Sequence, residues 1–392
     1  MRFRDALAGP GLAAIAEIKR RSPSAGDLRP DADPAELARG FERAGAAAVS
    51  ILVDERFGGS LADLRAARAA TRLPLLAKGF FREPGELAEL REAGADAALV
   101  LLRDVDDARA AALLEECEQL GLDALVEAHD DEELARAERL GADPIGLNAR
   151  DLDSFRIDRR AQLDLVAQAT LQHSVTRSER RVVVAESGIE SRAQAAAAEL
   201  AGADAILVGS ALMRAPDPEA ELRALLARPL VKICGLTREE DVAAAAEAGA
   251  DLAGFILARE SPRRADAVLA VPETMLSVAV LVGERAETRA DLVQLYPREN
   301  GHRGREAVLL RDETPVGQVL DLPWEEADPD HLRRAAARKG RIVLAGRLSP
   351  ENVRDAIERV HPWAVDASSQ LESAPGVKDY DRVRAFVEAA RA

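Results

Sequence analysis

The sequence is poor in cysteine, histidine and aromatic residues. Only two cysteines, Cys117 and Cys234, occur in 392 residues, and they lie far apart, which excludes a small fold held together by disulfides. The five histidines stand singly, and no pair of cysteines or histidines has the spacing of a zinc site. We therefore expect a chain with reduced thiols and no structural metal.

Long apolar runs and an excess of positive charge are also missing. Neither a secretory leader nor an apolar run of about 20 residues occurs, which predicts a cytoplasmic protein without a membrane span. The net charge is -16, and the arginines are interspersed with acidic residues instead of forming a basic stripe. Such a balance repels phosphate backbones, so nucleic acid is not expected as a partner.

A short phrase recurs along the chain, in which a helical stretch ends at glycine and passes into a β-branched run. It spans residues 93–100, 140–147, 201–208 and 248–255. Glycine just past a helix is the usual cap, and the apolar run that follows is long enough only for a strand. The phrase predicts a repeated unit of one strand and one helix.

Eight strands of the buried type are predicted in the first part of the chain. They lie at residues 14–19, 47–53, 73–78, 97–102, 123–127, 144–148, 182–186 and 205–209. Eight such units fit a closed (β/α) barrel, which needs roughly 200 to 250 residues. A doubly wound sheet is the alternative, but no Gly-x-Gly-x-x-Gly turn follows the first strand.

The chain is too long for one core, because single cores stop growing at roughly 250 to 300 residues. After Ala227-Arg-Pro, a fresh strand from Leu230 to Cys234 restarts the same pattern. We therefore predict an α/β protein of two tandem (β/α)8 TIM barrels, over residues 1–227 and 230–392.

Polar residues follow nearly every predicted strand of the first part, where a barrel gathers its reacting groups. They are Glu17, Lys19, Asp54, Lys78, Glu127, Asn148, Arg150, Glu186, Ser187, Gly209 and Ser210. A single residue of this kind is most often a salt-bridged plug, but their recurrence favours an active site. The small residues after the last two strands leave backbone N–H groups free where barrels commonly hold phosphate, which indicates a phosphorylated substrate.

Six segments of this part resemble indole-3-glycerol-phosphate synthase, in the same order. They are Ala16-Glu-Ile-Lys-Arg-Arg-Ser-Pro-Ser, Arg56-Phe-Gly-Gly-Ser-Leu, Leu125-Val-Glu-Ala-His-Asp, Ile145-Gly-Leu-Asn-Ala-Arg-Asp-Leu, Val184-Ala-Glu-Ser-Gly-Ile and Leu207-Val-Gly-Ser-Ala-Leu-Met. The resemblance implies closure of a carboxyphenylamino-deoxyribulose phosphate to an indole, with loss of carbon dioxide and water.

The resemblance also implies roles for individual residues. Lys78 is expected to be the general acid on the substrate oxygen, Glu127 the opposing acid/base in dehydration, and Lys19 the anchor of the carboxylate, which also assists protonation. Glu17, Asn148, Arg150 and Glu186 are expected to hold and polarise the substrate, and Ser22, Ser187, Gly188, Gly209 and Ser210 match phosphate or near-phosphate positions. Gly79 stands where the family usually has aspartate, so a carboxylate beside the expected acid is missing.

The second part resembles phosphoribosylanthranilate isomerase at both of its ends. The matching segments are Lys232-Ile-Cys-Gly-Leu-Thr, Ala250-Asp-Leu-Ala-Gly-Phe followed by Ser261-Pro-Arg, Val293-Gln-Leu, Leu344-Ala-Gly, Val365-Asp-Ala-Ser-Ser and Glu372-Ser-Ala-Pro-Gly-Val-Lys-Asp. A buried cysteine is by itself usually a small apolar residue, but the resemblance makes Cys234 the general base. It makes Asp321, after the strand Gln318-Val-Leu, the general acid. Such a rearrangement needs no cofactor.

By the same resemblance, Arg263 and Asp366 position the anthranilate and the sugar, and phosphate lies near Gly346, Ser368 and Ser369. Two glycines expected near the phosphate are replaced, by Arg347 and Gln370. Their loss either weakens phosphate binding or is offset by Arg347, whose guanidinium can neutralise the phosphate. The stretch between Val278 and Asp321 is too short for a helix after every strand, which predicts that some outer helices are missing.

These patterns favour an enzyme that catalyses two consecutive steps on small phosphorylated anthranilate-sugar substrates. One alternative is a synthase fused to an inactive barrel that serves only stability. Another is a second barrel that binds a metabolite and regulates the first, and a third is a different sugar-phosphate chemistry, inferred from the fold alone. Helices this rich in alanine show no distinct apolar surface for subunit pairing, so no oligomeric state is predicted.

Overall fold

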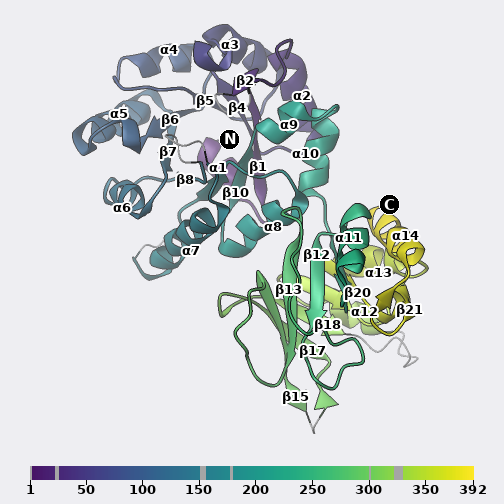
Figure 1. Cartoon of the computed structure of the whole chain (residues 1–392). Helices are drawn as coiled ribbons and strands as arrows, with labels where there is room; N and C mark the ends of the chain where they lie inside the picture. Colours follow the sequence, from purple (N-terminus) through teal and green to yellow (C-terminus); the bar gives the residue numbers. More distant parts are fainter. Residues whose placement is uncertain (1, 23–25, 151–155, 177–179, 300–301, 322–329) are drawn as a thin grey trace. The chain divides into compact units, whose positions relative to one another are not determined.

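The computed structural model describes residues 2–22, 26–150, 156–176, 180–299, 302–321 and 330–392. Internal contacts divide the chain into two units, residues 1–190 with 195–226 and residues 191–194 with 227–392. Each unit contains a closed barrel of eight strands (Figure 1). The predicted fold class, two tandem barrels of the α/β type, is confirmed.

All neighbouring strands of the first barrel are parallel. They are β1 (Ala13–Ile18), β4 (Ala48–Leu52), β5 (Leu75–Lys78), β6 (Ala97–Leu101), β7 (Asp123–Ala128), β8 (Ile145–Asn148), β9 (Val183–Glu186) and β10 (Ala205–Val208), and β10 pairs with β1 to close the ring. Each predicted strand is present, with ends displaced by at most two residues. Strands buried on both faces read as continuous apolar runs, which explains this agreement.

Helices cover the outside of the first barrel. They are α2 (Pro34–Ala44), α3 (Leu61–Ala70), α4 (Glu86–Glu92), α5 (Asp107–Leu120), α6 (Asp131–Arg139), α7 (Arg159–Thr176), α8 (Arg192–Ala201), α9 (Ser210–Arg214) and α10 (Pro218–Leu226). Asp33, Asp106 and Asp130 cap the first turns of α2, α5 and α6, since their carboxylates accept backbone N–H groups there. Within the described ranges, no helix has the length and apolar character needed to cross a membrane.

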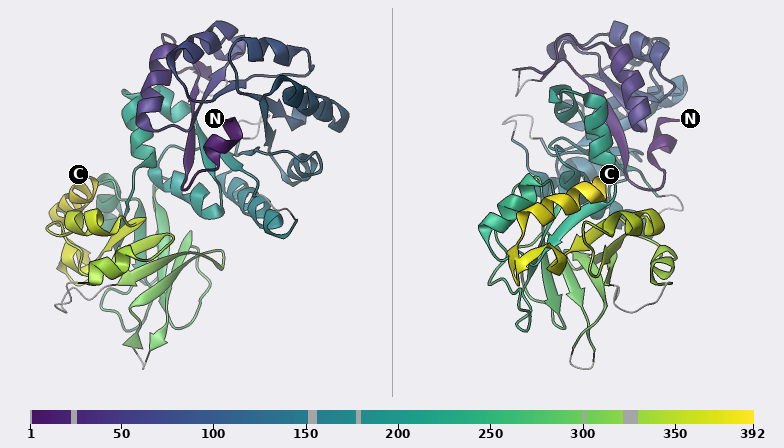
Figure 2. Two further views of the ribbon diagram at one scale, coloured as in Figure 1. Left: turned by 180° about the vertical axis from the view of Figure 1, so that it is seen from behind. Right: turned by 90° about the vertical axis from the view of Figure 1, so that its right-hand side faces the viewer.

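A short helix, α1 (Phe3–Leu7), closes one end of the first barrel. Phe3 and Leu7 are fully buried, in the same apolar cluster as Leu125 inside the barrel. The backbone N–H of Arg4 donates to Asp123, at the N-terminal end of β7. The helix therefore lies at the end opposite the C-terminal strand ends, across the barrel axis (Figure 2).

The second barrel has fewer helices than the first. Its strands are β11 (Leu230–Cys234), β12 (Leu252–Ile256), β13 (Leu276–Val282), β14 (Leu292–Tyr296), β17 (Glu306–Arg311), β18 (Thr314–Asp321), β19 (Ile342–Ala345) and β20 (Ala364–Ala367), and its helices are α11 (Glu239–Glu247), α12 (His331–Ala336), α13 (Val353–Val360) and α14 (Tyr380–Arg391). Between β12 and α12 the described residues contain no helix, and the helices gather on one flank (Figure 1). The predicted loss of outer helices is confirmed.

One strand of the second barrel runs opposite to the direction that the repeat of strand and helix predicts. β17 runs antiparallel to both of its neighbours, β14 and β18. A two-residue turn joins it to β18, and both turn residues, Asp312 and Glu313, have positive φ, as such hairpin turns require. Antiparallel strands can be joined without a crossover helix, which explains the short chain here. The start of β17, instead of its end, therefore lies at the mouth of the barrel.

Candidate active sites

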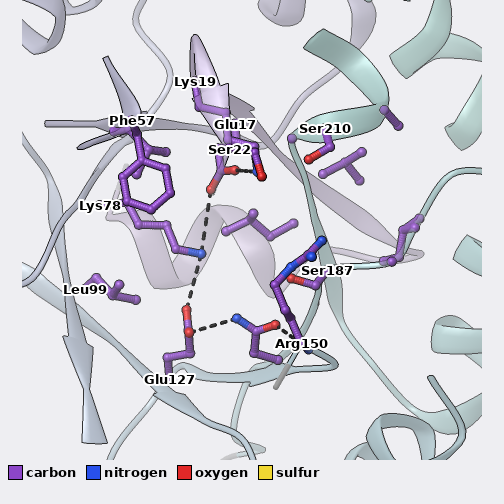
Figure 3. Close-up of a pocket in the computed structure, with 18 of the residues that line it drawn as sticks. Glu17, Lys19, Ser22, Phe57, Lys78, Leu99, Glu127, Arg150, Ser187 and Ser210 are labelled. Atoms are coloured by element: carbon purple, nitrogen blue, oxygen red, sulfur yellow. Dashed lines mark hydrogen bonds and ion pairs between the residues drawn. The ribbon is translucent and has the colours of Figure 1, made fainter. Parts of the chain in front are cut away.

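A cavity of about 1010 Å³, including its opening to solvent, lies at the C-terminal strand ends of the first barrel (Figure 3). Its polar lining residues are Glu17, Lys19, Ser22, Lys78, Glu127, Asn148, Arg150, Ser187, Glu190 and Ser210, with Gly79, Gly188 and Gly209 between them. Its apolar lining residues are Leu52, Phe57, Phe80, Leu99, Leu101, Ile157, Ile189, Leu207, Val208 and Ala211. The site thus combines a charged floor with an apolar wall.

Lys78, at the end of β5, lies among three buried carboxyl groups. Its Nζ atom is 2.5 Å from Oε2 of Glu186, 3.3 Å from Oε2 of Glu127 and 3.7 Å from Oε2 of Glu17. Burial alone favours a neutral amine, but the attraction of the three acidic groups outweighs it and raises the pKa of Lys78 well above its usual range. Lys78 is therefore a protonated ammonium group.

One acidic group of this cluster keeps its proton. The cluster holds three carboxyl groups and only two ammonium groups, since Lys19 Nζ lies 2.7 Å from Oε1 of Glu17. Burial and the nearby Glu127 raise the pKa of Glu186 to about 8, whereas Lys19 and Lys78 overcome burial and lower the pKa of Glu17. A protonated Glu186 leaves the five groups electrically neutral, as a buried cluster requires.

Glu127 is ionised and held on two sides. Asn148 donates from Nδ2 to its Oε1 atom at 2.9 Å, and Lys78 lies against its Oε2 atom. Burial would raise the pKa of Glu127, but Lys78, His129 and Asn148 together bring it below its usual range. A carboxylate that is already ionised can accept a proton from a substrate.

Two aromatic rings form part of the apolar wall. Phe57, from a 3-10 turn (Glu55–Phe57), and Phe80 stack with centroids 6.1 Å apart and planes 18° apart. The guanidinium of Arg56 lies 3.9 Å from the centroid of the Phe80 ring and 2.7 Å from Asp54. Asp54, a strand-end acid that the sequence grouped with the site, is not among the lining residues and instead holds Arg56. The wall suits a flat aromatic group.

The backbone after β9 and β10 approaches the cavity closely. Ser187 and Gly188 both have positive φ, 68° and 71°, and this conformation is strained for serine. A Cβ atom on Gly209 would lie 2.3 Å from Oε1 of Glu17 and 3.0 Å from Nζ of Lys19, so a larger residue would displace these two charged side chains. These residues bring backbone groups to the corner where the sequence predicts phosphate.

A second cavity, of about 1430 Å³ with its opening, lies at the corresponding end of the second barrel. The seven residues that the sequence assigned to this site all line it: Cys234, Arg263, Asp321, Gly346, Asp366, Ser368 and Ser369. Gln294, Tyr296, Arg305 and Arg347 also line it. Three guanidinium groups therefore face a cavity that also holds a thiol and carboxyl groups.

Cys234 lies above a buried lysine on the same strand. Lys232 Nζ is 2.8 Å from Oδ2 of Asp366 and 2.9 Å from Oε1 of Gln294. Burial raises the pKa of the Cys234 thiol, and the ammonium of Lys232 opposes that rise. Gly254 leaves room for both side chains, since a Cβ atom there would lie 2.8 Å from Sγ of Cys234 and 3.0 Å from Cε of Lys232. Lys232 thus offsets only part of the effect of burial, so the pKa of Cys234 stays above its usual value, and the ammonium is the counter-charge for a thiolate formed there.

Arg263 is oriented by a buried acid. Its Nε atom lies 2.8 Å from Oε2 of Glu372, and Glu372 also binds Nζ of Lys378 at 2.9 Å. Only the Nε atom of Arg263 contacts Glu372, so the two terminal nitrogens of the guanidinium can donate to an anionic ligand.

Comparison with known proteins identifies the first barrel. A family model described as indole-3-glycerol phosphate synthase matches residues 1–225. Indole-3-glycerol phosphate synthase 2 of Streptomyces coelicolor is 47% identical over 225 residues, which cover 57% of this chain and 84% of that protein. The chain belongs to the indole-3-glycerol phosphate synthase family. The synthase of Micrococcus luteus is also 47% identical, over 56% of this chain and 80% of its own length.

The C-terminal part of the second barrel matches another family model. The model of N-(5'-phosphoribosyl)anthranilate (PRA) isomerase matches residues 325–389. Among solved structures, TrpF from Jonesia denitrificans is 28% identical over 42% of this chain and 97% of its own, with a TM-score of 0.34. PRA isomerase from Thermotoga maritima is 26% identical over 42% and 99%, with a TM-score of 0.32. The chain thus combines a synthase barrel and an isomerase barrel of tryptophan biosynthesis.

Among the residues to which the resemblance gives a role in the synthase site, Glu186 alone does not line the cavity. It is 1% exposed and contacts Lys78, whereas the others stand in the wall or floor. Its contact with the substrate remains a prediction. The missing carboxylate at Gly79 does not leave Lys78 loose, because Glu186 and Glu127 hold its ammonium.

Sequence reasoning missed Arg305 and His129. Arg305 precedes the reversed strand β17, and its carbonyl accepts the backbone N–H of Asp321 at 2.9 Å. Only the reversal brings Arg305 to the mouth, and no local pattern signals it. His129 lies in a segment that resembles the family, two residues after Glu127 and therefore on the same face of the extended chain, which was the available signal.

The synthase reaction is expected to slow above pH 8 because of Glu186. As pH rises through the Glu186 pKa of about 8, the cluster gains a negative charge that repels an anionic substrate. We expect kcat/KM of the synthase to fall on this basic limb, and the limb to disappear in Glu186→Gln, which cannot ionise. Initial rates from pH 6 to 8.5, below the His129 pKa of about 9, measure this, and an unchanged limb in the variant would contradict the assignment.

Proposed function

We propose that the two barrels catalyse consecutive reactions. The isomerase barrel converts phosphoribosylanthranilate to carboxyphenylamino-deoxyribulose phosphate by an Amadori rearrangement, and the synthase barrel closes this product to indole-3-glycerol phosphate. Membership in the two families supports both activities. The observation that carries the proposal is the position of Lys78, an ammonium among carboxyl groups on the floor of a cavity with an aromatic wall.

In the synthase barrel, the substrate ring lies against Phe57 and Phe80, and Lys19 and Arg150 attract its carboxylate and phosphate. Lys78 protonates the sugar carbonyl oxygen while the ring carbon that bears the carboxylate attacks the carbonyl carbon. Carbon dioxide then leaves, and its bonding electrons restore the aromatic ring. Lys19 donates a proton to the new hydroxyl, which leaves as water, and Glu127 takes a proton from the neighbouring carbon, so that the double bond of the indole forms.

In the isomerase barrel, Asp321 and Cys234 act on one sugar. Asp321 protonates the ring oxygen and opens the furanose. The Cys234 thiolate then removes a proton from the sugar carbon next to the one that bears the nitrogen, and the resulting enol becomes a ketone. Oδ1 of Asp366 and Oγ of Ser368 are buried, yet have no hydrogen-bond partner among the described residues. Buried polar atoms normally have partners, and the sugar hydroxyls or phosphate can supply them.

We further propose small phosphorylated anthranilate sugars as the partners of this chain and the cytoplasm as its location. A catalytic thiol at Cys234 requires a reducing compartment, because a disulfide or oxidised sulfur cannot accept a proton.

Complementation tests the two activities separately. The intact chain is expected to rescue a bacterial auxotroph that lacks the synthase and another that lacks the isomerase. Rescue of the synthase-deficient strain alone would favour an isomerase barrel that serves only stability or metabolite sensing. Assays of the purified chain with each substrate then measure the two turnover numbers.

Arg347 is expected to bind substrate phosphate at some cost in stability. It follows Gly346 in the cavity lining and has a φ of 54°, a conformation that costs a non-glycine residue about 1 kcal/mol or more. We expect Arg347→Gly to raise the melting temperature and to increase the isomerase KM about tenfold, as loss of a charge-assisted hydrogen bond does. Arg347→Ala removes the guanidinium but keeps the strained backbone, so it separates the two effects. An unchanged KM in both variants would contradict phosphate binding by Arg347.

A further inference from the structure

The synthase reaction consumes one proton in each turnover. The substrate carboxylate leaves as neutral carbon dioxide, and one oxygen of the sugar leaves as water, so carboxylate plus one proton gives indole, carbon dioxide and water. This balance rests on the proposed function of the first barrel. The enzyme must therefore take a proton from solvent before the next cycle.

The acidic and basic groups at the centre of the synthase site are far from free exchange with solvent. Glu17 and Glu127 are 3% exposed and Glu186 is 1% exposed, and a bound substrate covers the cavity above them. Lys78, in contact with all three, has only 14% of its side chain exposed. A route for protons that does not cross the substrate lets the site regain its proton while substrate or product fills the cavity.

His129 connects Glu127 to another carboxylate on the far side. Its Nε2 atom lies 3.3 Å from Oε1 of Glu127, and its Nδ1 atom lies 2.9 Å from Oε2 of Glu133, on α6. The backbone N–H of His129 also donates to that Glu133 oxygen at 2.9 Å, which fixes the pair. Nε2 makes no well-directed hydrogen bond in the described structure, so its proton is not committed to another group.

A separate cavity of the first barrel, the side cavity, reaches this pair from outside the active site. It has a volume of about 1210 Å³ with its opening, and both His129 and Glu133 line it. Asn148, Arg150 and Ile157 line this cavity and the catalytic cavity alike, and so form the wall between them. Water in the side cavity can therefore reach Glu133 and His129 while substrate fills the catalytic cavity.

We propose that His129 relays protons from the side cavity to Glu127 during the synthase reaction. After each turnover two donated protons have left in water and Glu127 has recovered one, so the site lacks one proton. Glu127 returns its proton to Lys78, 3.3 Å away, and its carboxylate then accepts the Nε2 proton of the imidazolium for the second donor. The imidazole that remains is protonated on Nδ1, so a turn of the ring about its Cβ–Cγ bond brings this N–H to the Glu127 side, and a solvent proton enters through Glu133 to the unprotonated Nε2. One proton enters from solvent in each turnover.

The charge state of the empty site agrees with this relay. Burial alone would lower the pKa of His129, but Glu127 and Glu133 outweigh burial and raise it to about 9. The imidazole is thus protonated at neutral pH and ready to donate. His129 does not touch the substrate and is a positioning and relay residue for Glu127.

The test is the variant His129→Gln, which keeps a polar side chain but cannot carry a proton through. We expect the synthase kcat to fall about tenfold or more, with KM within twofold of the wild type, because proton supply limits the cycle while binding is intact. Free imidazole in the assay is expected to enter the side cavity and restore turnover of the variant, and to leave turnover of the wild type unchanged. The solvent deuterium isotope effect on kcat should rise in the variant.

Two controls make the result specific. Glu132→Gln removes the neighbouring exposed carboxylate of α6 and should leave kcat unchanged, and isomerase turnover of the same chain reports intact folding. A kcat of His129→Gln within twofold of the wild type, or a loss with neither imidazole rescue nor a larger isotope effect, would overturn the relay. A wild-type chain without synthase turnover would instead overturn the proposed function, and the relay with it.

Discussion

Replacing Lys78 with methionine is expected to lower the synthase kcat by about 10²- to 10⁴-fold, the range for loss of a general acid. Methionine keeps the length of the side chain but cannot donate a proton. Without the ammonium, Glu17, Glu127 and Glu186 are left as buried acids in contact with the vacated space, so they will tend to hold protons. The loss should therefore appear in kcat at every pH, and it should not be rescued by raising the substrate concentration.

The isomerase activity of the same chain is the control for this variant. Lys78 lies in the first barrel, so isomerase turnover should stay within twofold of the wild type if the variant is folded. Lys78→Arg tests charge without the same proton transfer, since a guanidinium keeps its proton at all accessible pH values. A methionine variant with near-normal synthase rates would remove Lys78 from the role of acid.

Loss of the thiol in Cys234→Ala is expected to reduce isomerase turnover about 10²- to 10⁴-fold and to spare the synthase. The thiol stands above the buried Lys232, whose ammonium is bound by Asp366 and Gln294 and provides the counter-charge of the thiolate. Alanine removes the base and leaves that charge arrangement intact. The change is measured with phosphoribosylanthranilate as substrate, while indole formation is followed from the isomerised substrate.

Cys117→Ala is the matched control for this variant. Cys117 is the other thiol of the chain; it is buried in the first unit and lines neither of the two cavities. Its replacement should leave isomerase turnover unchanged. Equal loss of both activities in Cys234→Ala would show that the two sites do not act independently, and retained isomerase turnover would exclude Cys234 as the base.

The departure from the family at Gly79 has a structural explanation. A Cβ atom at this position would lie 2.8 Å from Cζ of Phe81, so the ring occupies the space that an aspartate side chain needs. Lys78 is held in place without that carboxylate, because Glu186 contacts its ammonium at 2.5 Å. Packing by Phe81 and the contact with Glu186 could not be read from the sequence, since both join segments that are distant along the chain.

The sequence by itself determined both barrels, the strands of the first barrel to within two residues, and which polar side chains stand at the strand ends. These features follow local rules, because apolar runs mark buried strands and parallel strands bring their C-terminal ends to one mouth. The tertiary structure decided the direction of β17 and the position of Arg305, which depend on which strands pair. It also decided the charge states around Lys78 and the contact between His129 and Glu127, because pKa values and proton routes depend on burial and on neighbours from other strands.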